Sequence, residues 1–257
     1  QIKEISEAVW ETFLIDQGAE ITIEINPGTV TEEKLTAFHR AGINRLSIGL
    51  QSTVDEELKR LGRIHSYEDF LHTYRMAREK GFENINVDLV SAIPGQRLSS
   101  WEETLKKVAQ LRPEHISAYS LIIEEGTPFY EKYGRARDDA DALRDAPLPD
   151  EEEERRMYRS TKKILGEYGY RQYEISNYAL PGYECRHNLG YWDRTEYLGI
   201  GLGASSLLHN RRWDFGEEPV ALSIQEQMEE YMFLGLRKTE GVSRSRFAGE
   251  FGRGLDE

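Results

Sequence analysis

Cysteine is the residue type that this sequence has least of, with Cys185 as its single example among 257 residues. One thiol cannot form an internal disulfide, so a reducing compartment fits the chain best. Apolar residues nowhere run for the roughly 20 positions that a membrane-spanning helix needs, and no secretory signal is visible. We therefore expect a cytoplasmic protein that is not an integral membrane protein.

Positive charge is also scarce. The sequence has 33 lysines and arginines against 46 aspartates and glutamates, which gives a formal net charge of -13. Nucleic acid phosphates repel such a chain on average, so we expect no nucleic-acid partner. At 39% hydrophobic residues the chain is long enough to bury one sizeable core and a small second one.

Three charged, helical stretches end in glycine followed by an apolar residue, in RAGI at 40–43, EKGF at 79–82 and EYGY at 167–170. Glycine just past a helix end takes the left-handed conformation that closes the last turn. Apolar residues of helical period follow Ser66 and Ser100, which we expect to be helix caps. Strand-like runs alternate with these helices at 21–26, 45–51, 85–90 and 115–123. Such alternation predicts a parallel sheet with crossover helices.

At a period of two, the first three strands have an apolar face and a polar or small face. The polar face includes Glu24, Gln51 and Asp88, which fall toward the carboxyl ends of their strands. A polar second face favours a barrel lumen over a sheet covered on both sides. In barrels the working residues lie at those strand ends. The three side chains therefore indicate ligand binding, while a structural hydrogen-bond network and an acid–base pair of Glu24 and Asp88 remain alternatives.

Longer motifs make the chain recognisable. In order, they read EINPGTVTEEKL, GINRLSIGLQS, LGRIHSYEDF, INVDLVSAIPGQ and YEISNYALPGYECRHNLGYW. They resemble radical S-adenosylmethionine (SAM) proteins of the oxygen-independent coproporphyrinogen oxidase family, and within it the HemW-type haem chaperone branch. The resemblance implies an α/β fold, a partial (β/α)6 TIM-like barrel without its first two strands, followed by a small α/β and helical C-terminal region.

The resemblance also implies SAM contacts for Glu24, Gln51, Arg63 and Asp88. Carboxylates and amides suit the ribose hydroxyls and the ammonium group, and Arg63 suits the carboxylate. Ile122, on the fourth expected strand, would lie near the adenine, although an apolar strand residue is more often core.

The chain departs from the family at the iron–sulfur cluster. Radical SAM proteins hold a [4Fe–4S] cluster with a CxxxCxxC loop, followed by a GGGTP-type motif, and neither is present here. We expect both to lie upstream of Gln1, because residues 21–26 match the third strand of the family barrel. As given, the chain cannot assemble the cluster through thiolates.

The HNxxYW pattern of His187, Asn188, Tyr191 and Trp192 resembles the signature of the haem chaperones, where it is associated with haem binding. An imidazole is a good axial ligand for haem iron, and Tyr and Trp offer flat apolar faces. His187 is the preferred ligand and Cys185 the second choice. The alternative is structural, because Tyr-Trp pairs are often core and His-Asn pairs often cap helices or join loop networks.

Beyond this motif, residues 196–209 resemble the glycine-rich strand that closes the SAM side of the family site. A helical stripe of Met228, Tyr231, Met232 and Leu234 predicts the core of a helical domain. We expect three regions: 1–135 as partial radical SAM barrel with strands 3 to 6, 150–222 as family-specific region, and 223–257 as the start of a helical domain.

The resemblance implies a haem chaperone that delivers haem to recipient haemoproteins, with SAM and a [4Fe–4S] cluster in the complete protein. The alternative is an oxygen-independent coproporphyrinogen III oxidase, a radical SAM decarboxylase whose cofactor supplies the chemistry. The HNxxYW segment favours the chaperone without that oxidase activity. A homodimer is one option for its assembly.

Overall fold

The computed structural model describes residues 1–127, 129–134 and 147–255. It divides into two compact units. Unit 1 comprises residues 1–171 and 176–183, and unit 2 comprises residues 172–175 and 184–257. The two are described separately below.

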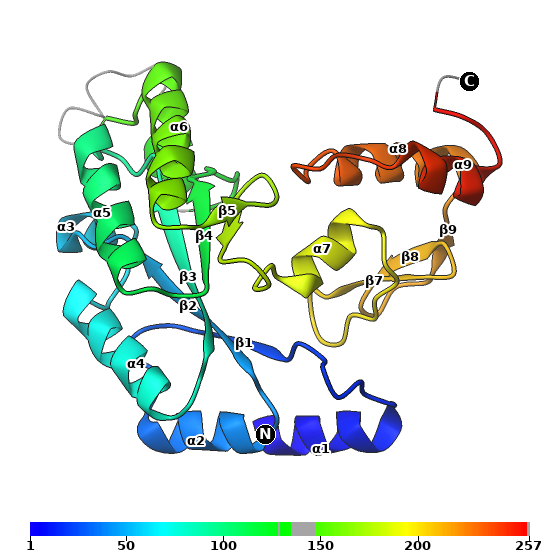
Figure 1. Cartoon of the computed structure of the whole chain (residues 1–257), viewed down its shortest axis with the longest axis horizontal. Coiled ribbons are helices and arrows are strands. Elements are labelled where there is room, and N and C mark those ends of the chain that lie inside the picture. Colours follow the sequence, from blue (N-terminus) through cyan, green and yellow to red (C-terminus); the bar gives the residue numbers. More distant parts are fainter. Residues whose placement is uncertain (128, 135–146, 256–257) are drawn as a thin grey trace. The chain divides into compact units, whose positions relative to one another are not determined.

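Unit 1 alternates helices and strands along most of its length (Figure 1). In chain order they are α1 (Ile2–Thr12), β1 (Thr22–Ile25), α2 (Glu32–Arg40), β2 (Arg45–Gln51), α3 (Asp55–Arg60), α4 (Tyr67–Glu79), β3 (Asn84–Ser91), α5 (Leu98–Gln110), β4 (His115–Ser120), the π-helix η1 (Tyr130–Gly134), α6 (Glu151–Glu167), β5 (Arg171–Gln172, which ends in unit 2) and β6 (Asn177–Ala179).

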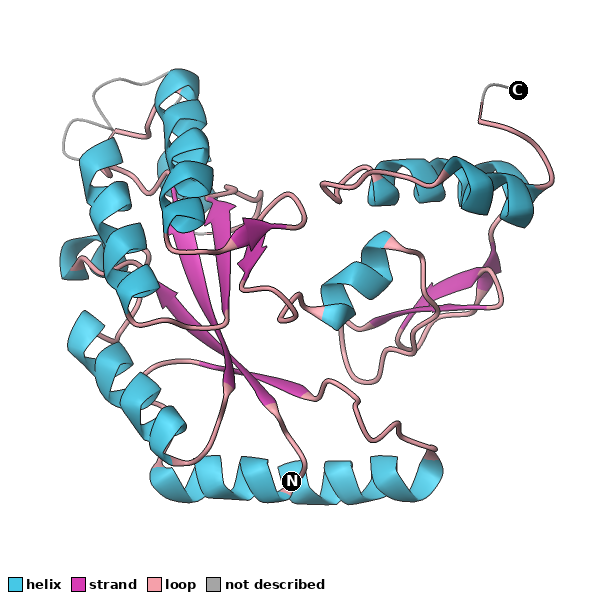
Figure 2. Cartoon of the chain, in the orientation of Figure 1, coloured by secondary structure: helices cyan, strands magenta, loops and turns pink. Residues whose placement is uncertain are grey.

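The strands form a sheet in the order β1-β2-β3-β4-β6-β5. The first four are parallel, as the alternation predicts, and β6 joins β4 antiparallel. Helices α4, α5 and α6 lie along one face of this sheet (Figure 2). The parallel strands therefore all present their carboxyl ends at one edge, which is where a ligand site of an α/β fold is expected.

The apolar face of the strands packs under these helices, as the period of two predicts. The six alternating side chains of β2 and β3 are 0% exposed: Leu46, Ile48, Leu50, Ile85, Val87 and Leu89. Phe70 of α4 and Leu105 of α5 are equally buried against them. Each such side chain contributes ~1.5–3 kcal/mol of hydrophobic stabilisation, which fixes the opposite, polar face toward the lumen.

All three predicted helix-closing glycines have a positive φ, with values of 88° at Gly42, 88° at Gly81 and 92° at Gly169. The Ser66 cap is also confirmed, because Ser66 and Asp69 form a capping box at the start of α4. The Ser100 cap is wrong. Helix α5 begins at Leu98, and the Ser100 hydroxyl within it donates instead to Glu57 Oε1 at 2.6 Å.

The fourth strand is shorter than the sequence indicates. β4 ends at Ser120, whereas an apolar run extends to Ile123. Ile122 lies beyond the strand and is 78% exposed in unit 1. Apolar character alone does not extend a strand without a neighbour to pair with, so the placement of Ile122 on the strand is wrong.

Unit 2 comprises a short helix, a three-stranded antiparallel sheet and two further helices: α7 (Arg186–Trp192), β7 (Ser205–Leu208), β8 (Arg211–Asp214), β9 (Val220–Ala221), α8 (Ile224–Gly235) and α9 (Arg244–Phe251). The glycine-rich stretch at 196–209 forms a strand only in its last part. Gly201 and Gly203 have φ values of 102° and 78°, which interrupt extended backbone before β7.

The predicted helical stripe is confirmed at Tyr231. This residue of α8 is buried and packs against the rings of Phe247 and Phe251 of α9, with centroids 5.4 and 5.9 Å away. Met228, Met232 and Leu234 are partly buried. The expected domain limits at 150 and 223 stay predictions, and the limit at 135 lies outside the described residues. Among the residues that the structure describes, no helix combines the length and apolar character that crossing a membrane requires.

Candidate functional site

Asp88 is the centre of a polar network on the lumen face of unit 1. Its carboxylate accepts hydrogen bonds from Ser47 Oγ at 2.9 Å and from Asn86 Nδ2 at 2.7 Å. Burial raises the pKa of the Asp88 carboxyl above its ordinary value, and the nearby charge of Glu24 acts in the same direction. Glu24 itself is exposed. The two predicted carboxylates thus share one face, with different surroundings.

Asn86 continues this network toward the amino ends of the strands. Its amide nitrogen donates to Ser47 and Asp88, so its oxygen is an acceptor for Ser117 Oγ at 3.1 Å and for His115 Nδ1 at 2.6 Å. This bonding defines His115 as the Nδ1–H tautomer. Burial lowers the pKa of His115 well below its ordinary value, and the positive charge of Arg45 adds to this effect. The imidazole is therefore neutral.

Gln51 is the last residue of β2, and Arg63 lies in the loop between α3 and α4, from which its side chain reaches the carboxyl end of β1. Gln51 is buried and has a φ of 73°, which is uncommon for a residue other than glycine. Arg63 Nη1 donates to Asn26 Oδ1 over 3.3 Å. A Cβ on Gly49 would lie 2.9 Å from Gln51 Nε2 and 3.3 Å from Asn26 Oδ1. Gly49 thus leaves room for the side chains of both Gln51 and Asn26.

Asn26 was not among the predicted site residues. It directly follows β1 in the NPG turn, and its place on the polar face of the first expected strand is the signal that could have identified it. Ile122 does not join this group of residues. It lines a separate cavity with Ala92, Tyr130 and Tyr133.

Glu57 supports the loop that follows Gln51. The carboxylate is 3% exposed and accepts from Ser52 Oγ at 2.6 Å, Ser100 Oγ at 2.6 Å and Gln96 Nε2 at 2.9 Å. Ser52 is the next residue after Gln51, so this buried hydrogen-bond centre restrains the end of β2.

The residues of the HNxxYW motif lie on α7 of unit 2. His187 and Tyr191 are one helical turn apart, and their rings meet edge to face with centroids 4.6 Å apart. Tyr191 meets Tyr197 in the same way at 4.7 Å. His187 is exposed, and Asn188 and Tyr191 are partly buried. The helix thus presents an imidazole at the end of a row of aromatic rings.

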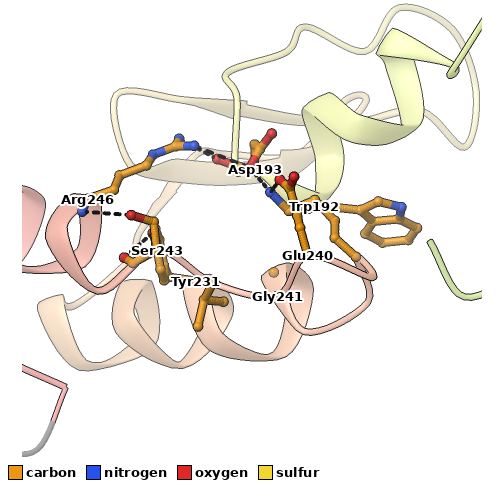
Figure 3. Close-up of a pocket in the computed structure, with 10 residues that line it drawn as sticks. Trp192, Asp193, Tyr231, Glu240, Gly241, Ser243 and Arg246 are labelled. Atoms are coloured by element: carbon orange, nitrogen blue, oxygen red, sulfur yellow. Dashed lines mark hydrogen bonds and ion pairs between the residues drawn. The ribbon is translucent and has the colours of Figure 1, made fainter. Parts of the chain in front are cut away.

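Trp192 has different surroundings from His187 and Tyr191. Its indole N–H donates to Glu174 Oε2 at 3.1 Å, and the Arg237 guanidinium lies 4.9 Å from its ring centroid. Trp192 also lines a pocket of about 420 Å³ with residues of α8 and α9 (Figure 3). Figure 3 shows its indole directed away from Asp193, which pairs with Lys238 and Arg246 at 2.6 and 3.2 Å.

Cys185 immediately precedes α7 and is 3% exposed. Its backbone N–H donates to the hydroxyl of Tyr173 at 3.2 Å. The thiol is therefore much less accessible to a large ligand than the exposed imidazole of His187.

Known families match both ends of the chain. A model described as Radical SAM superfamily matches residues 2–108, and one described as HemN C-terminal domain matches residues 222–257. Among solved structures, coproporphyrinogen III oxidase (HemN) from Escherichia coli superposes with a TM-score of 0.79 at 22% identity, covering 98% of this chain and 63% of that one. This likeness shows the fold: the α/β, TIM-like barrel of the radical SAM class, as predicted.

Curated relatives identify the family within the radical SAM superfamily to which the chain belongs. The heme chaperone HemW of Lactococcus lactis is 35% identical over 268 residues, covering 98% of this chain and 68% of that protein. The heme chaperone HemW of Bacillus subtilis is 39% identical over 256 residues, covering 93% and 65%. The chain therefore belongs to the HemW family of the radical SAM superfamily. It spans about two thirds of the length of these relatives.

Membership of this superfamily defines SAM and a [4Fe–4S] cluster as cofactors. The lumen of unit 1 fits SAM, because Gly49 leaves space beside Gln51 and Asn26 while Glu24, Asp88 and Arg63 supply both charge signs. The chain does not supply the cluster ligands. Cys185 is its only thiol, and no group of three potential metal ligands occurs among the described residues.

Proposed function

We propose that this protein is a haem chaperone that binds haem and passes it to recipient haemoproteins. Relatives that are 35% and 39% identical bear the name heme chaperone. The exposed imidazole of His187, set against the ring of Tyr191 at 4.6 Å, is the single observation of this chain that supports the proposal most directly. A neutral imidazole is a common axial ligand of haem iron.

The edge contact with Tyr191 restricts the rotation of the His187 ring, which lowers the entropy that iron binding removes. Tyr191 and Asn188 complete the haem contacts in this proposal. Trp192 supports the helix in this proposal and does not contact haem, because its indole N–H donates to Glu174 and its ring packs against the Arg237 guanidinium. Cys185 is the second candidate for the iron ligand and would have to become exposed first.

In the complete protein, SAM would bind across the strand ends through Glu24, Gln51, Arg63 and Asp88, with Ile122 as a further candidate near the adenine. The cluster would be held by cysteines outside these residues. We further propose a cytoplasmic location, no nucleic-acid partner, and a homodimer as one option for assembly. The net charge of -13 supports the exclusion of nucleic acid.

A titration of haemin into this chain, followed at the Soret band, tests the proposal. We expect saturable binding that His187→Ala weakens by at least about tenfold, the equivalent of ~1.4 kcal/mol. His209→Ala is the matched control, because it removes another exposed imidazole of unit 2 and should leave the spectrum unchanged. A spectrum that changes with Cys185→Ser and not with His187→Ala would move the ligand to the thiol. Absence of saturable binding would contradict haem carriage by this chain.

The alternative is a radical SAM decarboxylase acting on coproporphyrinogen III. Incubation of the purified, cluster-loaded, full-length protein with SAM and this substrate distinguishes the two functions. Release of CO2 together with 5'-deoxyadenosine would favour the enzyme. Haem transfer to an apo-haemoprotein without release of CO2 would favour the chaperone.

A further inference from the structure

The row of aromatic rings on unit 2 extends beyond the HNxxYW motif. Tyr197 follows α7 and packs its ring against Tyr191, with an interplanar angle of 83°. Its backbone exchanges two hydrogen bonds of 2.9 Å with Leu207, a buried residue of β7. The backbone at Tyr197 is therefore held by the sheet of unit 2, and its ring packs on that of Tyr191.

A guanidinium lies at the far end of this row. Arg212 of β8 donates from Nη1 to the Tyr197 hydroxyl at 3.4 Å and from Nη2 to Glu230 Oε1 at 2.9 Å. Its Nε is buried and has no hydrogen-bond partner among the described residues. The Arg212 side chain as a whole is 38% exposed. It therefore has donor capacity left and a route to solvent.

Glu230 pairs with Arg212 through one of its two oxygens. Its other oxygen, Oε2, accepts from Arg194 Nε at 3.0 Å, and Arg194 also pairs with Glu250 at 3.3 Å, so two guanidinium groups meet two carboxylates. Arg194 is 4% exposed and is the better protected partner of the two. Arg212 is the more exposed of the two and lies beside the Tyr197 hydroxyl, where it can donate to a ligand, and guanidinium groups pair with carboxylates in preference to most other groups.

We propose that Tyr197 and Arg212 belong to the haem-binding face, with the Tyr197 ring packing on the porphyrin and Arg212 donating to a propionate carboxylate. This inference rests on the proposed haem function. It adds an anchor for the acidic edge of the ligand at the end of the row opposite His187. It also adds two contact residues that lie outside the HNxxYW motif.

Binding of haemin and of haemin dimethyl ester to the same chain tests this inference, because the ester removes the propionate charges and keeps the ring and the iron. We expect the unaltered chain to bind haemin about tenfold more tightly than the ester. Arg212→Gln should weaken haemin binding by a similar factor and change ester binding by less than about twofold. Arg211→Gln is the matched control, since Arg211 precedes Arg212 on β8 and contacts the backbone oxygen of Pro219. It should change neither affinity.

Tyr197→Ala tests the aromatic part and should weaken haemin and ester equally, because a ring contact does not depend on the propionates. Equal affinity of the unaltered chain for the two ligands would overturn the role of Arg212, even if Arg212→Gln did not fold. Equal weakening of both ligands by Arg212→Gln would reduce it to structural support and overturn the propionate contact. Failure of haemin to bind at all would instead contradict the proposed function, a result that the ester comparison cannot mimic.

Discussion

The indole N–H of Trp192 and the carboxylate of Glu174 form a hydrogen bond of 3.1 Å in which the acceptor is 1% exposed. Glu174 also pairs its backbone with that of Lys238 in an isolated antiparallel bridge. The last residue of the HNxxYW motif therefore secures α7 to the segment after α8. His187 and Tyr191 lie on the same short helix and meet edge to face, with ring centroids 4.6 Å apart.

Trp192→Phe should lower the free energy of unfolding by ~1–3 kcal/mol, because it removes a donor from a buried carboxylate. Urea denaturation followed by circular dichroism measures this loss. Trp10→Phe, at a residue that is 47% exposed and far from this contact in the sequence, is the control and should change stability by less than about 0.5 kcal/mol. A normal stability of Trp192→Phe together with lost haem binding would instead make Trp192 a direct haem contact.

Gly49→Ala should impair SAM binding with little effect on stability. The new Cβ would lie 2.9 Å from Gln51 Nε2, the mobile end of a side chain that can move aside at low energetic cost. Equilibrium dialysis with labelled SAM should show affinity reduced by about tenfold, while the free energy of unfolding changes by less than ~1 kcal/mol.

Gly166→Ala is the matched control for this substitution. Gly166 lies inside α6 with nothing within 4 Å of the added Cβ, so the exchange should raise stability by up to ~1 kcal/mol through helix propensity. It should leave SAM binding unchanged. Unimpaired SAM binding by Gly49→Ala would contradict the placement of the ligand beside Gln51.

Glu57→Ala should destabilise the protein by ~3 kcal/mol or more, because two buried donors, from Ser52 and Gln96, and the part-buried hydroxyl of Ser100 lose their common acceptor. Glu56→Ala, at the preceding position, removes only an exposed pair with Lys59 and should cost less than ~0.5 kcal/mol. Thermal unfolding of the two variants side by side measures the difference. Similar melting temperatures would show that the Glu57 network contributes little.

Stability should decrease as the pH falls below about 6.5, and His115 should be one cause. Burial keeps the pKa of His115 well below its ordinary value of 6.5 in the folded protein, whereas the unfolded chain has the ordinary value. Between these two pKa values the unfolded state binds the proton and the folded state does not. The free energy of unfolding therefore falls with decreasing pH, by up to ~1.4 kcal/mol per pH unit.

The free energy of unfolding is measured by denaturation between pH 7.5 and 5, a window around the ordinary pKa of 6.5, for the unaltered protein and for His115→Gln. The comparison isolates the contribution of His115. The raised pKa of Asp88 acts in the opposite direction, because the folded protein then binds a proton that the unfolded chain lacks. It affects both proteins, so the difference between their slopes reports on His115. Parallel slopes would contradict a neutral, buried imidazole.

The two faces of the parallel strands were predictable because an extended strand alternates its side chains with a fixed period. That rule placed Leu46, Ile48 and Leu50 in the core and Asp88 on the lumen face. The positive φ of Gln51 was not predictable, since a side chain usually excludes this conformation and only tertiary contacts impose it. Helix-closing glycines were predictable for the complementary reason, as glycine adopts positive φ at low energetic cost.

The HNxxYW motif places His187 and Tyr191 on one side of α7 and Trp192 on another, and this could not be predicted without the secondary structure. Helix α7 has seven residues and contains Gly190, so it lacks a long apolar period and a strong propensity. Once the helix is known, His187 and Tyr191 fall on one face, and Trp192 points about 100° further round the axis. The same holds for Tyr197 and Arg212, which only the β7–β8 pairing brings beside the motif.

The chain passes between the two units three times, at 171/172, 175/176 and 183/184. Residues 172–175 are the first segment of unit 2, and they include Glu174, the acceptor for Trp192. A gene fragment starting at 184 would thus encode all of α7 and lack the acceptor that secures it. Transfer of the proposed haem-binding segment into another protein must therefore include residues 172–175 as a separate insert, or supply a carboxylate from the host protein in their place.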